Sequence, residues 1–159
     1  MNYGMPGIST KNPTAPASKD IRYEKAVAQH AKILEVTDRA LAIAKESVAV
    51  AKKSDDKELY GITLFSLAQI QLMAAKPEEA LKSAQEAMEV GQKSGEKHTE
   101  ILALCLCAEV HIAIGNSAEA VTSAEKGLKI AKKMGDAAGE EYAKRVLEHM
   151  LGADANKEE

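Results

Sequence analysis

The sequence contains few of the large aromatic residues around which most protein cores pack. Aromatic residues make up only 3% of its 159 residues, and tryptophan is absent. Because hydrophobic residues still make up 45% of the chain, a core must be built from alanine, leucine, isoleucine, valine and methionine. Alanine has the highest helix propensity. No run alternates apolar and β-branched residues with polar ones, so the sequence predicts an all-α protein.

Cysteine and long apolar runs are equally scarce. The two cysteines, Cys105 and Cys107, lie within one helical pattern. This argues against a disulfide framework and favours a reducing intracellular compartment, either the cytoplasm or an organelle. No stretch approaches the roughly 18 apolar residues of a membrane span. The N-terminus lacks the basic and then apolar arrangement of a secretory signal.

The charge of the chain is small and evenly spread. The net charge is −3, and lysine and glutamate are interspersed. Nucleic-acid binding requires a basic stripe, and an anionic membrane surface also attracts basic segments. We therefore expect a protein or peptide partner, with no nucleic acid and no direct membrane insertion.

Residues with catalytic or metal-binding chemistry are scattered. Cys105 and Cys107 are two positions apart, roughly 200° around a helix axis, so they cannot easily chelate one metal ion together. We expect both to be buried as small apolar residues, and His111 to serve packing. No Ser–His–Asp set, glycine-rich phosphate loop or carboxylate pair stands in a supporting context. The sequence therefore predicts no catalytic residues, no cofactor and no metal site.

One pattern of residues recurs along the chain. Apolar and small residues follow helical spacing over residues 64–88, with a break at 75–77, and the pattern returns about forty residues later with a break at 115–117. A weaker copy precedes both, which indicates a repeat array. The matched positions are Val27, Ala28, Ala40, Leu41 and Ala44 in the first copy, Leu64, Leu67, Ala68, Gln71, Ala80 and Ala84 in the second, and Leu104, Cys107, Ala108, His111, Ala120 and Ala124 in the third.

The breaks in this pattern predict where helices end. Pro77 suits a first helical turn, and Gly95 and Gly135 suit left-handed C-caps. A further break is expected at Thr37 and Asp38, which align with the starts of the later second helices. No glycine or proline enforces that break, so one long helix is the alternative. The expected helices cover about 19–36, 38–54, 58–74, 77–94, 97–114, 117–135 and 137–151.

Composition divides the chain into three parts. Residues 1–18 contain three of the four prolines among small polar residues, too little apolar surface to fold alone. We expect an extended or disordered tail there, which becomes ordered only through contact. The helical repeat domain is expected over residues 19–152, and a polar tail over residues 153–159.

The recurring positions resemble the tetratricopeptide repeat, a helix–turn–helix unit that stacks into a solenoid. In that family small residues, here Ala68 and Ala80, let the two helices of a hairpin approach closely, and Ala87 and Gly127 do the same toward the next hairpin. The resemblance implies a right-handed α-solenoid of about three hairpins plus a C-terminal capping helix. The usual repeat has about 34 residues. The longer spacing here resembles the variant found in kinesin light chains.

The resemblance also implies a surface for partners, because such solenoids bind along the concave face lined by the first helix of each hairpin. The corresponding positions follow helical spacing of three, four and three, so each set lies on one helix face. The sets are Arg22, Lys25 and Gln29 in the first copy, Ile62, Phe65, Gln69 and Leu72 in the second, Leu102, Cys105, Glu109 and Ile112 in the third, and Tyr142, Arg145 and His149 in the capping helix.

Two functions fit this surface. The first is a non-catalytic interaction module or scaffold whose groove receives a peptide or helix, with Phe65 as an apolar anchor. The alternative is a structural accessory subunit of a large multiprotein assembly, docked through its N-terminal tail or convex face. The helical spacing alone does not separate groove residues from core, and Leu72, Leu102 and Ile112 fit both interpretations.

Overall fold

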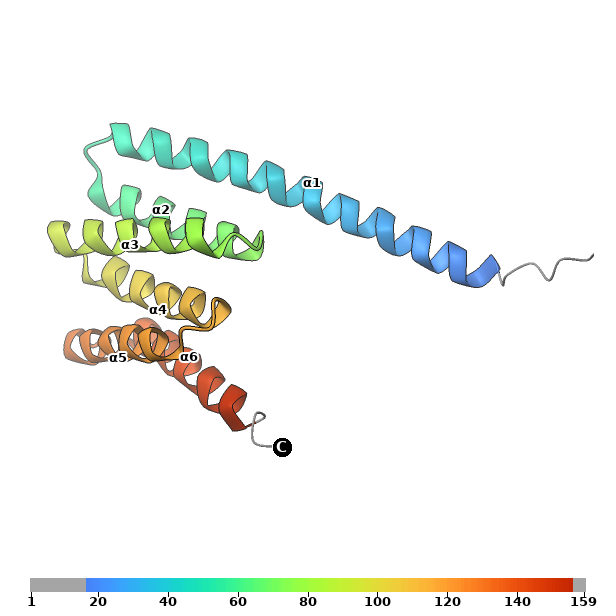
Figure 1. Ribbon diagram of the computed structural model, residues 1–159. Helices are drawn as coiled ribbons and strands as arrows, with labels where there is room; N and C mark the ends of the chain where they lie inside the picture. The colour runs from blue at the N-terminus through green and yellow to red at the C-terminus, as the bar shows by residue number, and fades with distance from the viewer. Residues whose placement is uncertain (1–16, 156–159) are drawn as a thin grey trace, which may run out of the picture. The chain divides into compact units, whose positions relative to one another are not determined.

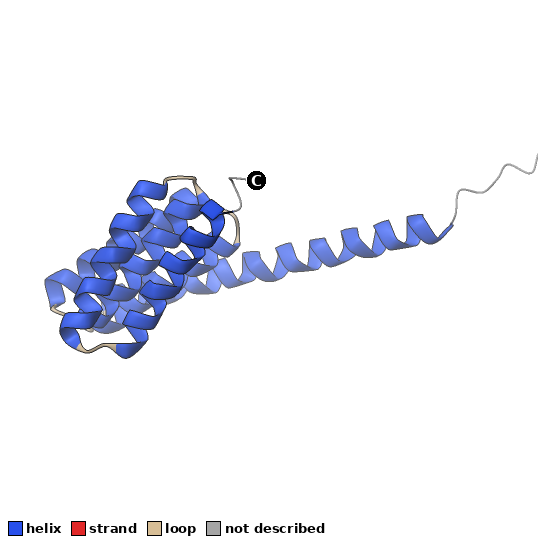
Figure 2. Ribbon diagram, turned by 90° about the horizontal axis from the view of Figure 1, so that it is seen from below, coloured by secondary structure: helices blue, strands red, loops and turns tan. Residues whose placement is uncertain are grey.

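The computed structural model describes residues 17–155, and every regular element in that range is an α-helix (Figure 2). The all-α prediction is therefore confirmed. Of the tails predicted over residues 1–18 and 153–159, residues 1–16 and 156–159 lie outside the described residues, whereas residues 17, 18 and 153–155 belong to the first and last helices. The helices are α1 (Ala17–Lys53), α2 (Lys57–Met73), α3 (Pro77–Ser94), α4 (Lys97–Ala113), α5 (Ser117–Met134) and α6 (Ala137–Ala155). The chain divides into two compact units, Met1–Glu35 and Val36–Glu159, and α1 contributes to both.

The second unit is a stack of helical hairpins (Figure 1). Helices α2 and α3 form one hairpin and α4 and α5 the next, while α3 packs on α4 and α5 on α6. The first helices also pack side by side, α2 on α4 and α4 on α6. They begin at Lys57, Lys97 and Ala137, forty residues apart. This arrangement confirms the α-solenoid, with α6 as its last helix.

The break predicted at Thr37 and Asp38 is wrong, because α1 continues through it as one helix of 37 residues. The physical reason is that neither residue prevents helix propagation, as only glycine and proline carry a large helical penalty. The first copy of the repeat is therefore a single helix. Within the second unit, Leu41 and Ala44 of α1 pack with Leu67 of α2.

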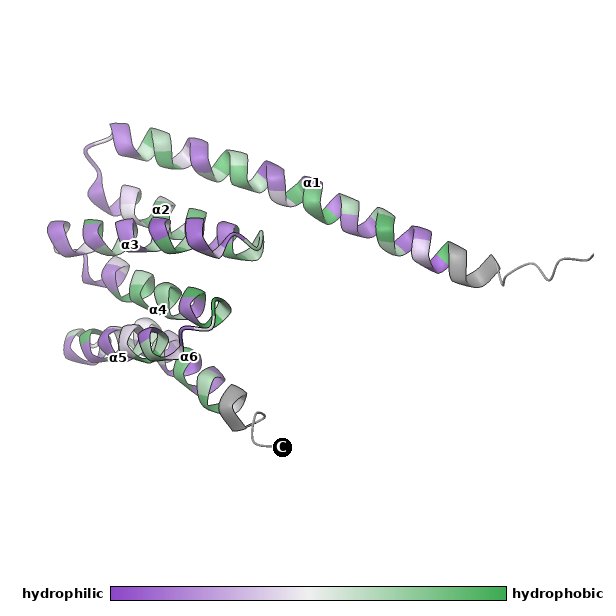
Figure 3. Ribbon diagram, in the orientation of Figure 1, coloured by the Kyte–Doolittle hydropathy of each residue, from purple (hydrophilic) through white to green (hydrophobic). Residues whose placement is uncertain are grey.

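The core depends on small side chains at the helix contacts. Ala68, Ala80 and Ala87 are fully buried, as predicted for close hairpin packing. Helix α4 is apolar over most of its middle, which fits its packing against α2, α3, α5 and α6 (Figure 3). Cys105 and Cys107 are both buried thiols, which confirms their predicted packing role.

Residues with positive φ close the turns of the stack. Gly95 has φ 82° and Gly135 has φ 68°, in the left-handed conformation predicted for these C-caps. Between the two helices of each hairpin, Gly115 has φ 82°, but Ala75 stands at the same place with φ 56°. Ala75 therefore adopts a backbone conformation that disfavours any side chain. Within the described part of the chain, no helix is both long and apolar enough to cross a membrane.

Candidate functional site

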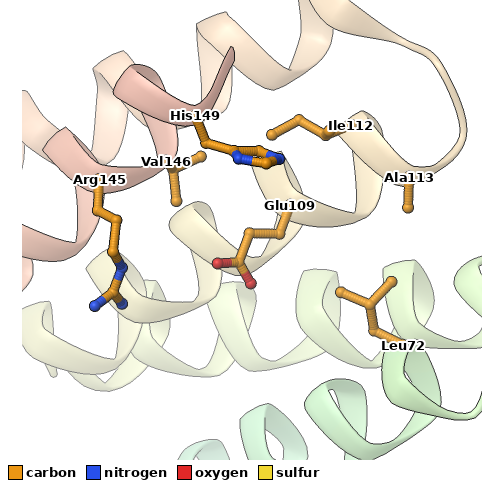
Figure 4. Close-up of a pocket in the computed structure, with 7 residues that line it drawn as sticks. All are labelled: Leu72, Glu109, Ile112, Ala113, Arg145, Val146 and His149. Atoms are coloured by element: carbon orange, nitrogen blue, oxygen red, sulfur yellow. The ribbon is translucent and has the colours of Figure 1, made fainter. Parts of the chain in front are cut away.

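A hollow of about 450 Å³ crosses the first helices of the stack. Helices α2, α4 and α6 each contribute to it, and the side chains of α4 and α6 lie three and four positions apart, which places them on one face of each helix. The lining residues are Leu72, Glu109, Ile112, Ala113, Arg145, Val146 and His149 (Figure 4). We call this hollow the groove.

The groove combines apolar walls with a central carboxylate. Figure 4 shows Glu109 reaching into the middle of the groove, with Arg145 on one side and Leu72 on the other. Because Arg145 and His149 are exposed, the guanidinium and the imidazole lie at the rim of the groove. An apolar groove with few placed polar groups is the usual character of a binding site.

Tyr142 fixes the position of the Glu109 carboxylate. Its hydroxyl donates a hydrogen bond to Glu109 Oε2 at 3.0 Å, and the guanidinium of Arg145 lies 5.2 Å from the centre of the Tyr142 ring. Burial raises the pKa of Glu109, although the Tyr142 hydrogen bond and the charges of Arg145 and His149 oppose this shift. Burial, followed by the charge of Glu109, raises the pKa of Tyr142, so its hydroxyl remains a donor. The groove thus offers one oriented acceptor group.

The structure brings together part of the surface predicted from the sequence. The predicted residues that line the groove are Leu72, Glu109, Ile112, Arg145 and His149.

The other predicted positions lie elsewhere. Cys105 is fully buried and Tyr142 is 9% exposed, and both belong to one core cluster. Burial, the largest cause, raises the pKa of the Cys105 thiol to about 12, which keeps it protonated. The remaining positions are of two kinds: half-buried Phe65 and Leu102, and exposed Arg22, Lys25, Gln29, Ile62 and Gln69.

Phe65, the predicted apolar anchor, is half-buried and packs against three separate core clusters. We therefore expect truncation of Phe65 to destabilise the fold rather than to weaken binding alone.

The sequence prediction missed Ala113 and Val146. Both line the groove, and both lie beside predicted positions, one residue after Ile112 and Arg145. A single line of residues per helix was predicted, whereas a hollow between helices is also lined by flanking positions. Among residues 17–155, no three His, Cys, Asp or Glu side chains lie together in a way that could hold a metal ion.

Comparison with known proteins gave one family. A family model for anaphase-promoting complex subunit 5 matches residues 23–59, 50–107 and 98–154. The three matches together extend over most of the helical region, from within α1 to within α6. No curated protein matches the chain.

Proposed function

Since the chain belongs to the family of anaphase-promoting complex subunit 5, we propose that it is a non-catalytic structural subunit of a large multiprotein assembly. The observation that carries this proposal is the extent of the match, which continues through residues 23–154 instead of covering one hairpin. Stacked helical repeats present extended surfaces along their length, and such surfaces suit contact with several neighbours. Docking would use the convex face or the N-terminal segment.

Further properties belong to the same proposal. The interspersed charges and the net charge of −3 favour protein neighbours over nucleic acid or a membrane surface. Two buried thiols suit a reducing intracellular compartment. We also propose that the repeats are of the longer tetratricopeptide-like kind, as in kinesin light chains, because the first helices recur every forty residues where the usual repeat has about 34.

The test is native purification of the tagged chain, expressed at its normal level, followed by gel filtration and identification of co-eluting proteins by mass spectrometry. We expect the chain in a high-mass fraction together with other subunits of an anaphase-promoting complex, and an untagged extract as control should lack them. Elution only at the mass of the isolated 17.0 kDa chain, or of a small oligomer of it, would contradict the proposal.

A second candidate function is supported by the groove itself, which would receive a peptide or helix from a neighbouring subunit. The carboxylate of Glu109 within apolar walls favours a segment that carries one basic side chain among apolar ones. Glu109→Gln removes the charge but keeps an acceptor for Tyr142, so it should weaken such a contact by about tenfold or more. Gln85→Ala, an exposed change on α3, should leave it unchanged. If Glu109→Gln, Gln85→Ala and the wild-type chain all bind the segment with equal affinity, the groove does not have this role.

A further inference from the structure

The solenoid has an apolar face at its N-terminal end, formed by α2 and by the part of α1 that follows Val36. Two adjoining hollows of about 440 and 390 Å³ lie on it and share Ile43, Ser47 and Thr63. Ile43 and Val50 are each 64% exposed, and Leu59 is 44% exposed. We call this surface the α1–α2 face and define it by Ile43, Ser47, Val50, Leu59, Thr63 and Ile70.

The repeat register shows what packs on such a face elsewhere in the stack. Forty residues later the same positions are Ser83, Ala87, Val90, Thr99, Ala103 and Val110. Five of these six are buried, with Ala87, Ala103 and Val110 at 0% exposure, and Val90 is half-buried. They are buried because α2, a first helix, packs against both α3 and α4. By this equivalence, the α1–α2 face is a surface on which the first helix of a hairpin can pack.

The same register identifies the segment that corresponds to this helix. Helix α2 spans residues 57–73, so its equivalent forty residues earlier is 17–33, which lies in α1. Val27 is equivalent to Leu67, which is 7% exposed, and Ala28 is equivalent to Ala68, which is fully buried. Val27 itself is 51% exposed in this structure. The segment thus carries the apolar stripe of a packed first helix.

The polar residues of the segment and of the face also correspond. In the second copy, one core cluster contains Leu64, Ala87 and Ala103. The equivalent residues of the first copy are Glu24, Ser47 and Thr63. An apolar trio is thus replaced by a carboxylate and two hydroxyls. In this structure the Ser47 hydroxyl donates to the carbonyl oxygen of Ile43 and the Thr63 hydroxyl to that of Tyr60. If the segment packs on the face, these hydroxyls can turn to the Glu24 carboxylate, which is the stronger acceptor.

We propose that a second copy of the chain supplies this helix, so that residues 17–35 of each copy pack on the α1–α2 face of the other. A continuous helix cannot pack against its own length, and α1 is continuous from Ala17 to Lys53. Exchange between two copies needs no turn within α1. Reciprocal exchange of one element is a known route to closed dimers, and it removes Val27, Ile43 and Val50 from water.

The first test measures the oligomeric state of the full chain by sedimentation velocity over a range of concentrations. We expect a dimer of twice the 17.0 kDa chain mass. Val27→Glu and Ile43→Glu should each raise the dimer Kd by about tenfold or more, because each places a charge in an apolar contact. Met134→Glu, at another exposed apolar residue, should leave the Kd unchanged. A monomeric wild-type chain, or a dimer that both face variants leave intact, would overturn the proposal.

The second test separates exchange between copies from folding within one copy. Glu24→Cys and Ser47→Cys chains with different tags are mixed and oxidised, and we expect a disulfide-linked pair that carries both tags. Gln29→Cys, whose equivalent Gln69 is exposed in the second copy, should link poorly with Ser47→Cys. A third chain carries both Glu24→Cys and Ser47→Cys. If the mixed single variants form no disulfide, or if the double variant forms the disulfide only within one chain, exchange is refuted. Because only the isolated chain is used, this outcome is independent of its place in an assembly.

Discussion

Replacing Gly91 by alanine tests how closely α3 approaches α4. A Cβ at this position would lie 2.7 Å from the backbone nitrogen of Glu100 and 3.0 Å from the carbonyl oxygen of Glu96. These two atoms form a hydrogen bond of 3.1 Å in the first turn of α4, so neither can rotate away. Alanine gains up to about 1 kcal/mol in helix propensity, whereas overpacking costs about 1–3 kcal/mol. We therefore expect Gly91→Ala to lose roughly 1 kcal/mol of unfolding free energy.

Gly127→Ala is the matched control, since it makes the same exchange in α5. The nearest atom to its Cβ would be Cys105 Sγ at 3.3 Å, a side-chain atom that can shift. The higher helix propensity of alanine should then determine the change in stability, so the variant should be unchanged or up to about 1 kcal/mol more stable. Denaturant unfolding followed by circular dichroism measures both variants. If the two variants change stability by the same amount, or if Gly91→Ala is as stable as wild type, the assigned helix approach is wrong.

Three further predictions concern Ala75, the pair Ala80 and Ala120, and Glu109. Ala75→Gly should raise the unfolding free energy by about 0.5–1 kcal/mol, because glycine adopts the φ of 56° without strain; a less stable variant in denaturant unfolding would contradict this. Ala80→Leu and Ala120→Leu should each lower it by about 1–3 kcal/mol, since both alanines are fully buried; unchanged denaturation midpoints would show that these contacts are not close. Burial raises the pKa of Glu109 above its usual 4.5, so the folded state holds the proton more tightly and stability falls as pH rises above that value. Glu109→Gln should therefore be more stable than wild type at pH 7 but not at pH 4, and equal stability profiles would refute the shift.

The helices from α2 onward follow closely from local sequence signals. Pro77 begins α3, and Gly95 and Gly135 end α3 and α5, as their backbone preferences predict. At Thr37 and Asp38 no such residue is present, and periodicity alone could not decide between a turn and a continuous helix. The error in α1 therefore occurs where the local signal was weakest.

The sequence predicted which helix faces line the groove, but not how deeply each side chain is buried. The resemblance to tetratricopeptide repeats assigned Leu72, Glu109 and Ile112 to the concave face, and all three line the groove. The same resemblance also selected Cys105, which is fully buried. Spacing gives the side of a helix on which a residue lies, but burial depends on how closely the neighbouring helices approach.

By itself the sequence determined the helical class, the repeat of forty residues and the small residues at the contacts, because these depend on propensity and periodicity along one chain. Only the tertiary structure decided which contacts are tight. Gly91 and Gly127 are both helical glycines, and the equivalent position in a neighbouring copy holds alanine in each case. Yet one faces backbone of α4 and the other a movable sulfur. Likewise, the raised pKa of Glu109 depends on burial by helices that are distant in sequence. Distances between helices result from the packing of the whole stack, so no local pattern records them.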